Sequence, residues 1–388
     1  MKVALFIERF DPARGGRERS TAEIAAALAG RGCRVDVVCM AGGDGPAGVN
    51  VVPLRTRGLG RTHRFRRFVA AARRRCAAGA YDVTHAMFPL PGADIYQIRG
   101  GTLPGLRAAY LRMRGGPAAL RRLAWSLNRL RALQGRLEAG VMADGAARIL
   151  PVSPMVAEEV RAGYGRRAGV RVVLNGVAVP AVDAVQREAW RREVRGQWGL
   201  GDGDVAVVCP AVNYELKGVG PLIDAFGRAR CRADARALKL IVLGAAPPRA
   251  LRVCGPRDPV GRRFDSAIDG VHHVSSLSPI WPAYAAADAV VLLSWYDACS
   301  RVVLEAVAMG VPCLTTRFNG AADLLADGAG WIVSSPAAGD EVAAALAALA
   351  DPAARQAAAD ACGPLGRRVT MERHVDELME IYAEVMRA

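Results

Sequence analysis

The sequence predicts an α/β protein made of two doubly wound halves, and three observations lead to this fold class. Short apolar runs of strand length alternate with longer helical patterns along the chain. Strand, helix and strand follow one another between residues 3 and 39, as in a βαβ unit with parallel strands. The alternation starts again after residue 204, and 388 residues suffice for two domains that each bury a core.

In the first half, each expected strand is a short apolar run. A loop with Gly15 and Gly16 and a helix over 18–30 follow the first of these strands. A basic helical region that includes Arg114 is expected over 106–140, and a helix over 155–165 is closed by a glycine. The strands are VALFI (3–7), GCRVDVVC (32–39), VNVVPL (49–54), YDVTHAMF (81–88) and ARILPVS (147–153).

In the second half, the same pattern follows a polar stretch at 181–203 that lacks long apolar runs. We place the domain boundary there, with one domain over 1–178 and the other over 179–366. Helices are expected over 221–230 and 301–310. The strands are VAVVCPA (205–211), LKLIVLG (238–244), DAVVLLS (288–294), VPCLTT (311–316) and GWIVSS (330–335). The carboxyl ends of the strands should border a cleft between the halves, which is the expected ligand site.

The charge balance is strongly basic, with 52 Lys+Arg against 37 Asp+Glu and a formal charge of +15. Only Lys2, Lys217 and Lys239 are lysines, so arginine replaces lysine almost everywhere. A GC-rich genome would explain that replacement, whereas attraction to phosphates or a membrane surface would explain the charge. The arginines cluster between residues 55 and 136, which favours a basic face on the first domain that meets anionic lipid.

Composition also excludes several classes of protein. With 52% apolar and 23% charged residues the chain is not disordered, and no run of 18 strongly apolar residues predicts a membrane span. Charge appears at Glu8 and Arg9, too early for a signal peptide, so we expect a cytoplasmic protein. The nine cysteines form no CxxC pair, which predicts small buried residues rather than a zinc site or a disulfide framework.

The usual nucleotide and hydrolase motifs are missing from the sequence. No GxGxxG follows the first strand, where Gly15-Gly16 stands instead, and the Gly201-Asp-Gly203 segment precedes a strand. The sequence also lacks a GxxxxGK[ST] phosphate loop and a GxSxG nucleophile elbow. The sequence therefore does not support a nicotinamide-dependent dehydrogenase or the protein classes that these two other motifs define.

Two loops carry residues suited to phosphate. Glycines at 15 and 16 allow a backbone to approach a ligand closely at the start of a helix, although many loops contain Gly-Gly. Lys217 follows the first strand of the second half, in the segment Asn213-Tyr-Glu-Leu-Lys-Gly. A compact ammonium suits a phosphate oxygen, while a solvated loop lysine is the alternative.

A third segment, YDACSRVVLE (296–305), leads from a buried strand into a helix. Asp297 lies in its loop, and Glu305 lies one to two turns into an otherwise apolar helix. Carboxylates accept hydrogen bonds from neighbouring sugar hydroxyls, and the amides of Ser300 to Val302 begin the helix and can hold a diphosphate. The alternatives are that Asp297 only caps the helix and that Glu305 lies on the surface. A carboxylate within an apolar helix needs a partner, which argues against the second alternative.

His85 ends the strand YDVTH in the first half. It either faces the cleft or is a hydrogen-bonded histidine of the core.

Together these segments resemble glycosyltransferase family four, the retaining nucleotide-sugar transferases with the GT-B fold. The resemblance runs from Val3 to the final helix. It rests on PARGGRERSTAEIAAALAGRGCRVDVV, NYELKGVGPLIDAF, the Asp-x7-Glu pattern from Asp297 to Glu305, RFNGAADLL (317–325) and LNGV (174–177). Within the family, LKG and TTRFNGAADLL are most similar to lipopolysaccharide-core glucosyltransferases.

The resemblance implies two Rossmann-like domains that face each other across a cleft, with the terminal helix (367–388) crossing back to the first domain. It implies that the second domain binds the donor and the first domain the acceptor. The implied donor contacts are Glu305 on the ribose, Asp297 on the sugar, and Lys217, Asn213 and the amides of Ser300, Arg301 and Val302 on the diphosphate. Gly15, Gly16 and Arg17 would contact the donor from the first domain, and the implied catalytic residues are Asp297, Lys217 and His85.

Three positions depart from the family's pattern. Many members carry an arginine shortly before the lysine, where this chain has Asn213, and a glutamate where it has Asp297. The core glucosyltransferases have an aspartate after the segment that matches DIYQIRGG (94–101), where this chain has an arginine and glycines.

The predicted activity is transfer of a hexose, with glucose and a UDP-sugar as the first choices, to a lipopolysaccharide-core or other lipid-linked glycan. No metal or other cofactor is expected, because the fold that the resemblance implies typically uses none. Expected partners are the nucleotide sugar, the acceptor and an anionic membrane surface on the inner face, but not nucleic acid. Alternatives are a cytosolic transferase with a small acceptor and a pseudoenzyme that binds nucleotide sugar. We expect Glu305→Ala to abolish donor binding and to leave the fold intact, because Glu305 would line the cleft.

Overall fold

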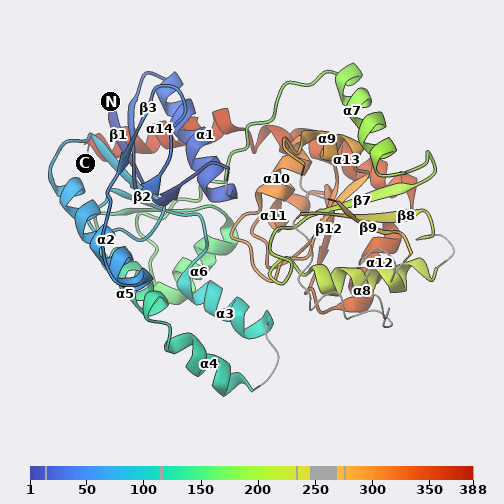
Figure 1. Ribbon diagram of the computed structural model, residues 1–388, viewed down its shortest axis with the longest axis horizontal. Helices are drawn as coiled ribbons and strands as arrows, with labels where there is room; N and C mark the ends of the chain where they lie inside the picture. The colour runs from blue at the N-terminus through green and yellow to red at the C-terminus, as the bar shows by residue number, and fades with distance from the viewer. Residues whose placement is uncertain (14, 114–116, 233–234, 245–268, 275–276, 388) are drawn as a thin grey trace. The chain divides into compact units, whose positions relative to one another are not determined.

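The computed structural model describes residues 1–388 except 14, 114–116, 233–234, 245–268, 275–276 and 388. The chain forms two compact units, one of Met1–Ala178 with Val369–Ala388 and the other of Val179–Arg368 (Figure 1). Each unit contains a six-stranded sheet in which every pair of neighbouring strands is parallel. The predicted α/β class with two doubly wound domains is confirmed.

The sheet of the first unit has the strand order β3-β2-β1-β4-β5-β6. Its central strands are buried on both faces, which explains why they are continuous apolar runs in the sequence. Sequence analysis missed β5, because this strand has only four residues and one of them is Gln97. The strands are β1 (Lys2–Phe10), β2 (Arg34–Gly42), β3 (Val49–Pro53), β4 (Val83–Ala86), β5 (Ile95–Ile98) and β6 (Arg148–Pro151).

Helices cover both faces of this sheet. Phe10, Leu28 and Tyr382 pack in one core with α1 and α14, while Phe6 and Phe68 pack in a second core with α2. The expected basic helical region at 106–140 is three helices, α3 to α5, and Arg114 lies outside the described residues. The helices are α1 (Gly16–Gly30), α2 (Arg61–Ala77), α3 (Leu103–Met113), α4 (Ala118–Ser126), α5 (Arg129–Ala143), α6 (Pro154–Tyr164) and α14 (Met371–Arg387).

The C-terminal helix α14 belongs to the first unit and packs on α1 (Figure 1). The chain enters it beside Gly176, where a β-carbon would lie 2.7 Å from the β-carbon of His374 and 2.9 Å from the α-carbon of Met371. Only glycine therefore fits there. Val177 donates from its amide to the carbonyl of Val369 at 2.9 Å, which fixes the start of α14 against residues 174–177.

The sheet of the second unit has the order β12-β11-β10-β7-β8-β9. In both sheets the strand order reverses between the first and fourth strands of the unit, β1 and β4 or β7 and β10, and ligands of doubly wound sheets bind beside such a reversal. The strands are β7 (Val205–Pro210), β8 (Leu238–Leu243), β9 (Val271–Val274), β10 (Ala289–Leu292), β11 (Cys313–Thr316) and β12 (Gly330–Val333). The helices are α7 (Ala184–Gln197), α8 (Val219–Arg230), α9 (Trp281–Ala286), α10 (Arg301–Ala308), α11 (Ala322–Leu325), α12 (Gly339–Ala348) and α13 (Pro352–Arg367).

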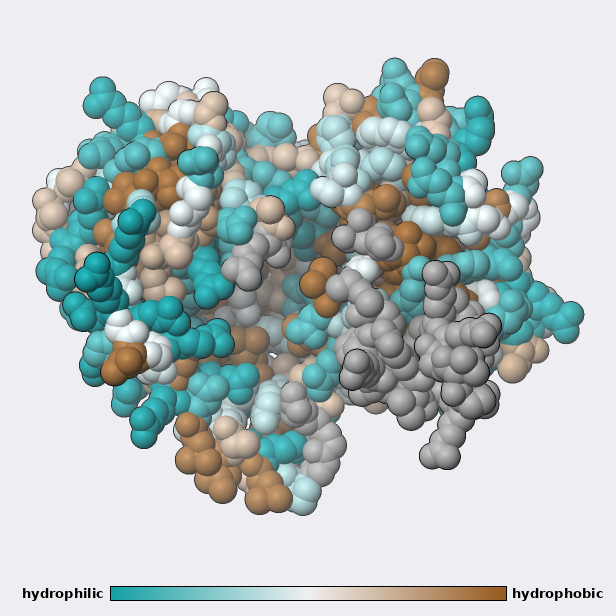
Figure 2. Space-filling view, viewed as in Figure 1, coloured by the Kyte–Doolittle hydropathy of each residue, from teal (hydrophilic) through white to brown (hydrophobic). Residues whose placement is uncertain are grey.

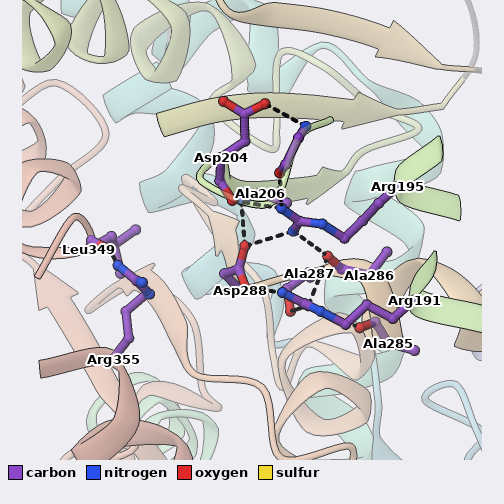
Figure 3. Close-up of polar contacts among 11 residues, drawn as sticks. Arg191, Arg195, Asp204, Ala206, Ala285, Ala286, Ala287, Asp288, Leu349 and Arg355 are labelled. Carbon is purple, nitrogen blue, oxygen red and sulfur yellow. Dashed lines mark hydrogen bonds and ion pairs between the residues drawn. The ribbon is translucent and has the colours of Figure 1, made fainter. Parts of the chain in front are cut away.

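The polar stretch in which we expected only a boundary is largely the helix α7. Its buried contacts are made by guanidinium groups rather than by a run of apolar side chains (Figure 3). Arg191 and Arg195 both bind the carboxylate of Asp288, at 2.7 Å and 3.0 Å, and Asp288 also accepts from the Ala206 amide at 2.7 Å. This network joins α7 to the amino ends of β7 and β10, the sheet edge opposite to the one where ligands bind.

The cysteines are mostly as expected. Six of the eight described cysteines are buried. Cys76 is only partly buried and Cys231 is exposed, which corrects the expectation for these two positions, and Cys254 lies outside the described residues. Among the described helices, none is long and apolar enough to cross a bilayer.

Candidate functional site

The carboxyl ends of β7 and β10 bring together two residues that lie 80 positions apart. The two strands are paired neighbours, so the segments that follow them leave the sheet at the same edge. There the ammonium group of Lys217 forms an ion pair with the carboxylate of Asp297. Their side chains are only 21% and 19% exposed, so the pair is partly shielded from water.

The turn after β7 fixes the backbone of Lys217. Asn213 accepts from the Lys217 amide with its carbonyl, at 2.9 Å, and from the Leu216 amide with its side chain, at 3.1 Å. Gly218 has φ +64°, and a β-carbon there would lie 2.2 Å from the carbonyl oxygen of Leu293. The glycine thus lets the turn pack directly on the chain that leaves β10.

The loop after β10 is held by the loop after β11. The Asp297 amide donates to the carbonyl of Phe318 at 2.9 Å, and the Gly320 amide donates to the carbonyl of Asp297 at 2.8 Å. The buried side-chain oxygen of Asn319 accepts from the amides of Ser300 at 3.2 Å and Ala321 at 3.1 Å. Sequence analysis did not single out Asn319; its signal was an Asn-Gly pair directly after a strand.

Helix α10 begins at Arg301, directly behind Asp297. Ser300 precedes the helix and is 2% exposed, and its hydroxyl has no hydrogen-bond partner among the described residues. First-turn amides, such as that of Val302, have no acceptor within a helix and carry the positive end of its dipole. The end of α10 beside the Lys217–Asp297 pair therefore suits an anion.

Glu305 lies inside the second unit rather than on its surface. Its side chain is 6% exposed, and its two oxygens accept from the Tyr284 hydroxyl and the Arg301 guanidinium, both at 3.0 Å. The carboxylate thus has the partners that its apolar helix requires. Burial, followed by the nearby Glu305 charge, raises the pKa of Tyr284 well above its usual value, so this phenol stays protonated and donates. The carboxylate is therefore mostly shielded from solvent by α9 and Arg301, and its contact with a donor stays a prediction.

Gly15, Gly16 and Arg17 lie at the start of α1 in the first unit. Gly15 is extended, and its carbonyl accepts the first bond of the helix from the Arg19 amide at 3.0 Å. Arg17 forms an ion pair of 3.2 Å with Glu8 on β1. This guanidinium is therefore partly neutralised by a carboxylate from its own unit.

His85 is a core residue of the first unit. It is fully buried on β4, and its Nδ1 lies 2.7 Å from the Tyr382 hydroxyl of α14. Burial, aided by the charge of Arg99, lowers the pKa of His85 to about 3. The imidazole is therefore neutral and enclosed at neutral pH, which favours the core interpretation over the catalytic one.

Comparison with known proteins identifies the two halves. The model of "Glycosyltransferase Family 4" matches residues 14–179, and that of "Glycosyl transferases group 1" matches residues 204–352. The chain belongs to glycosyltransferase family four. Lys217 and the segment from Asp297 to Glu305 both lie in the second of these matches.

Curated members of the family are similar over part of the chain. A D-inositol 3-phosphate glycosyltransferase of Arthrobacter sp. (strain FB24) is 30% identical over 235 residues, which are 59% of this chain and 52% of that protein. An alpha-D-kanosaminyltransferase of Streptomyces kanamyceticus is 30% identical over 203 residues, which are 51% of this chain and 50% of that protein. The chain thus spans about half the length of these relatives.

Solved structures confirm the GT-B fold over the whole chain. WaaG, a glycosyltransferase involved in lipopolysaccharide biosynthesis, has a TM-score of 0.79 at 19% identity, with 98% of this chain and 99% of WaaG covered. HepE of Anabaena, solved with UDP and glucose, has a TM-score of 0.69 at 18% identity, with 99% of both chains covered. At such identities the likeness concerns the fold.

Proposed function

We propose that this glycosyltransferase moves a hexose, with glucose as the first choice, from a UDP-sugar to a lipopolysaccharide-core or other lipid-linked glycan, with retained configuration. The observation that carries the proposal is the Lys217–Asp297 pair beside the start of α10, at the strand-order reversal. At one sheet edge, a cation and the amides at the start of a helix match the diphosphate of a nucleotide sugar, and a carboxylate matches its hydroxyls. UDP and glucose are bound in the HepE structure, which has the same fold.

In this proposal each residue of the second unit has one task at the donor. Lys217 turns from Asp297 to the diphosphate, assisted by the amides of Arg301 and Val302, and Asp297 becomes available to the sugar hydroxyls. The Ser300 amide, the third amide predicted for the diphosphate, already donates to the Asn319 side chain at 3.2 Å. The Asn213 side chain uses its oxygen on Leu216, so its NH₂ group can donate to a phosphate. Lys217 and the helix amides then stabilise the charge that develops on the leaving diphosphate.

Glu305 is proposed to hold the ribose. Each of its oxygens accepts one bond within the protein, and a carboxylate oxygen can accept a second. From the first unit, Gly15, Gly16 and Arg17 are proposed to approach the donor. His85 remains a candidate catalytic residue from the resemblance, and its burial and low pKa argue for a positioning role through β4 instead.

A thermal-shift panel of UDP-, GDP-, ADP- and TDP-glucose tests the donor assignment. A ligand that binds only the folded protein at 100 times its dissociation constant stabilises it by about 2.7 kcal/mol. We expect UDP-glucose to raise the melting temperature more than the other three. A panel in which no nucleotide sugar raises it would refute the donor site and favour a protein that binds no nucleotide.

The proposed membrane contact is supported by the surface of α4. Leu120 and Leu123 of α4 and Leu127, which directly follows it, are 63%, 55% and 71% exposed. Figure 2 shows a hydrophobic patch over α4 at the lower edge of the molecule. Nearby, the guanidinium of Arg131, from α5, lies 3.9 Å from the ring centre of Trp125 on α4. Apolar side chains beside arginines are typical of helices that lie in the interface of an anionic membrane.

Co-sedimentation with phosphatidylglycerol-containing vesicles tests the membrane contact. We expect the triple variant Leu120→Ser, Leu123→Ser, Leu127→Ser to bind vesicles about tenfold or more weakly, because three apolar side chains are lost from the interface. Val185→Ser is the matched control, since Val185 is 80% exposed on the second unit. Equal binding by the triple variant and the wild type would exclude α4 as the contact.

The second candidate is transfer to a small soluble acceptor. The relative named D-inositol 3-phosphate glycosyltransferase favours it, because D-inositol 3-phosphate is a small soluble molecule. Product analysis after incubation with soluble sugar phosphates and with lipid-linked glycans separates the two candidates.

A further inference from the structure

A second site is formed by arginines in the first unit. A pocket of about 990 Å³ lies where β1, β2 and β3 end, next to the start of α2. Five guanidinium groups line it, and they come from β1, from the segment after β3 and from α2. The arginines are Arg9, Arg55, Arg57, Arg61 and Arg64.

The positive charge of this pocket is not balanced from within. Among the described residues, no ion pair involves any of the five guanidinium groups. Two carboxylates, those of Glu8 and Asp11, also line the pocket and offset only part of the charge of the five guanidinium groups. Glu8 accepts from Arg17 at 3.2 Å and from Gln134 at 3.4 Å, and Asp11 accepts from the Ala13 amide at 3.2 Å.

The direction of α2 increases this imbalance. Arg61 and Arg64 lie in the first turn of α2, which contains no acidic residue, so two cations stand at the positive end of the helix dipole. That placement is unfavourable for a cation, whereas Arg74 and Arg75 lie in the last turn, where cations are favourable. A polyanion in the pocket would reverse the sign of this interaction and would also find the first-turn amides of α2.

We propose that the pocket binds a phosphate-bearing group of the acceptor. Guanidinium groups bind phosphate through paired N–H donors, and groups from three segments can surround a phosphate from several sides. The floor of the pocket contains Phe65, which is 4% exposed, and Leu130, so an apolar surface lies beside the charges for a sugar ring. The inference rests on the proposed transferase function and specifies its acceptor as phosphorylated.

Titration calorimetry with inorganic pyrophosphate at low salt tests the pocket. Pyrophosphate can also reach the proposed donor site, so Lys217→Ala is titrated in parallel. We expect Arg55→Ala/Arg57→Ala/Arg61→Ala to weaken pyrophosphate binding about 30-fold or more at a site that survives Lys217→Ala, because several charge-assisted hydrogen bonds are lost. Arg73→Ala/Arg74→Ala, which removes two exposed arginines of α2 outside the pocket, should change that affinity by about twofold at most.

Competition identifies the source of the phosphate. If glucose 6-phosphate displaces pyrophosphate from the Arg-dependent site, the phosphate belongs to a soluble sugar phosphate. If phosphatidic acid vesicles displace it, the phosphate belongs to a lipid headgroup. Pyrophosphate binding that depends on Lys217 alone, or that neither competitor displaces, overturns the proposal. If no nucleotide sugar raised the melting temperature but the Arg-dependent binding of pyrophosphate were intact, only the donor site would be refuted.

Discussion

At the residue scale, Lys217 and Asp297, which we propose to bind the donor, form an ion pair with each other in the structure. A partly buried ammonium or carboxylate without a partner would be costly, and each group supplies the other. Sequence analysis placed both residues at the ends of strands but could not show that the two strands are neighbours. Their contact follows from the order of β7 and β10 in the sheet, a long-range property that no local pattern encodes.

For Glu305, the sequence predicted that the carboxylate has a partner but did not identify the residue. The apolar helix around it predicted a partner, but the Tyr284 hydroxyl comes from α9, 21 residues earlier in the chain. We expected Glu305→Ala to leave the fold intact. With the carboxylate buried, we instead expect a loss of stability, because the variant removes the acceptor of a buried phenol and a partner of the Arg301 guanidinium.

Glu305→Ala should therefore lower the free energy of unfolding of the second unit by about 3 kcal/mol, as expected when a buried charge pair loses one member. Glu305→Gln keeps an oxygen acceptor and should cost about 1 kcal/mol. Urea unfolding measures both values. A Glu305→Ala protein as stable as the wild type would show that the carboxylate contributes nothing to the fold.

At the element scale, α14 is joined to β4 and to residues 174–177 by buried histidines. His85 contacts Tyr382 of α14, and the Nδ1 of His374 donates to the Leu174 carbonyl at 2.7 Å. Burial lowers the pKa of both imidazoles, with the positive charge of Arg99 as the next cause. Both rings are therefore neutral in the folded protein and gain a proton when the chain unfolds below pH 6.5.

These lowered pKa values predict an acid-sensitive first unit. Stability contributed by a neutral buried histidine is present above pH 6.5 and is lost as the pH falls toward the folded pKa, by about 1.4 kcal/mol per pH unit for each histidine. Between pH 6 and pH 4, the free energy of unfolding should fall less steeply with decreasing pH in His85→Phe than in the wild type. The difference is the contribution of one histidine. Tyr382→Phe is the control, since it deletes the hydrogen bond but leaves His85 buried. Equal slopes in wild type and His85→Phe would contradict the assignment.

At the scale of the whole molecule, local patterns predicted most strands and the two-domain α/β class. They failed for β5 and β9, four-residue strands that contain Gln97 or the pair His272-His273. They also failed for the arginine-rich helix α2 and for α7, whose packing uses arginines. In each case long-range contacts hold a segment whose own sequence is ambiguous. In the candidate site, the residues at strand ends could be predicted, whereas Asn319 and Tyr284 support them from other segments and could not.

The central claim is that the sheet edge at β7 and β10 binds a nucleotide sugar through Lys217. Titration calorimetry of UDP-glucose against wild type, Lys217→Ala and Lys239→Ala tests it most directly. Lys239 is the matched control, because it lies on β8 and forms its ion pair with Asp204 at 3.7 Å. The account predicts that Lys217→Ala weakens binding about tenfold or more, while Lys239→Ala binds like the wild type. Equal affinities for wild type and Lys217→Ala would contradict it.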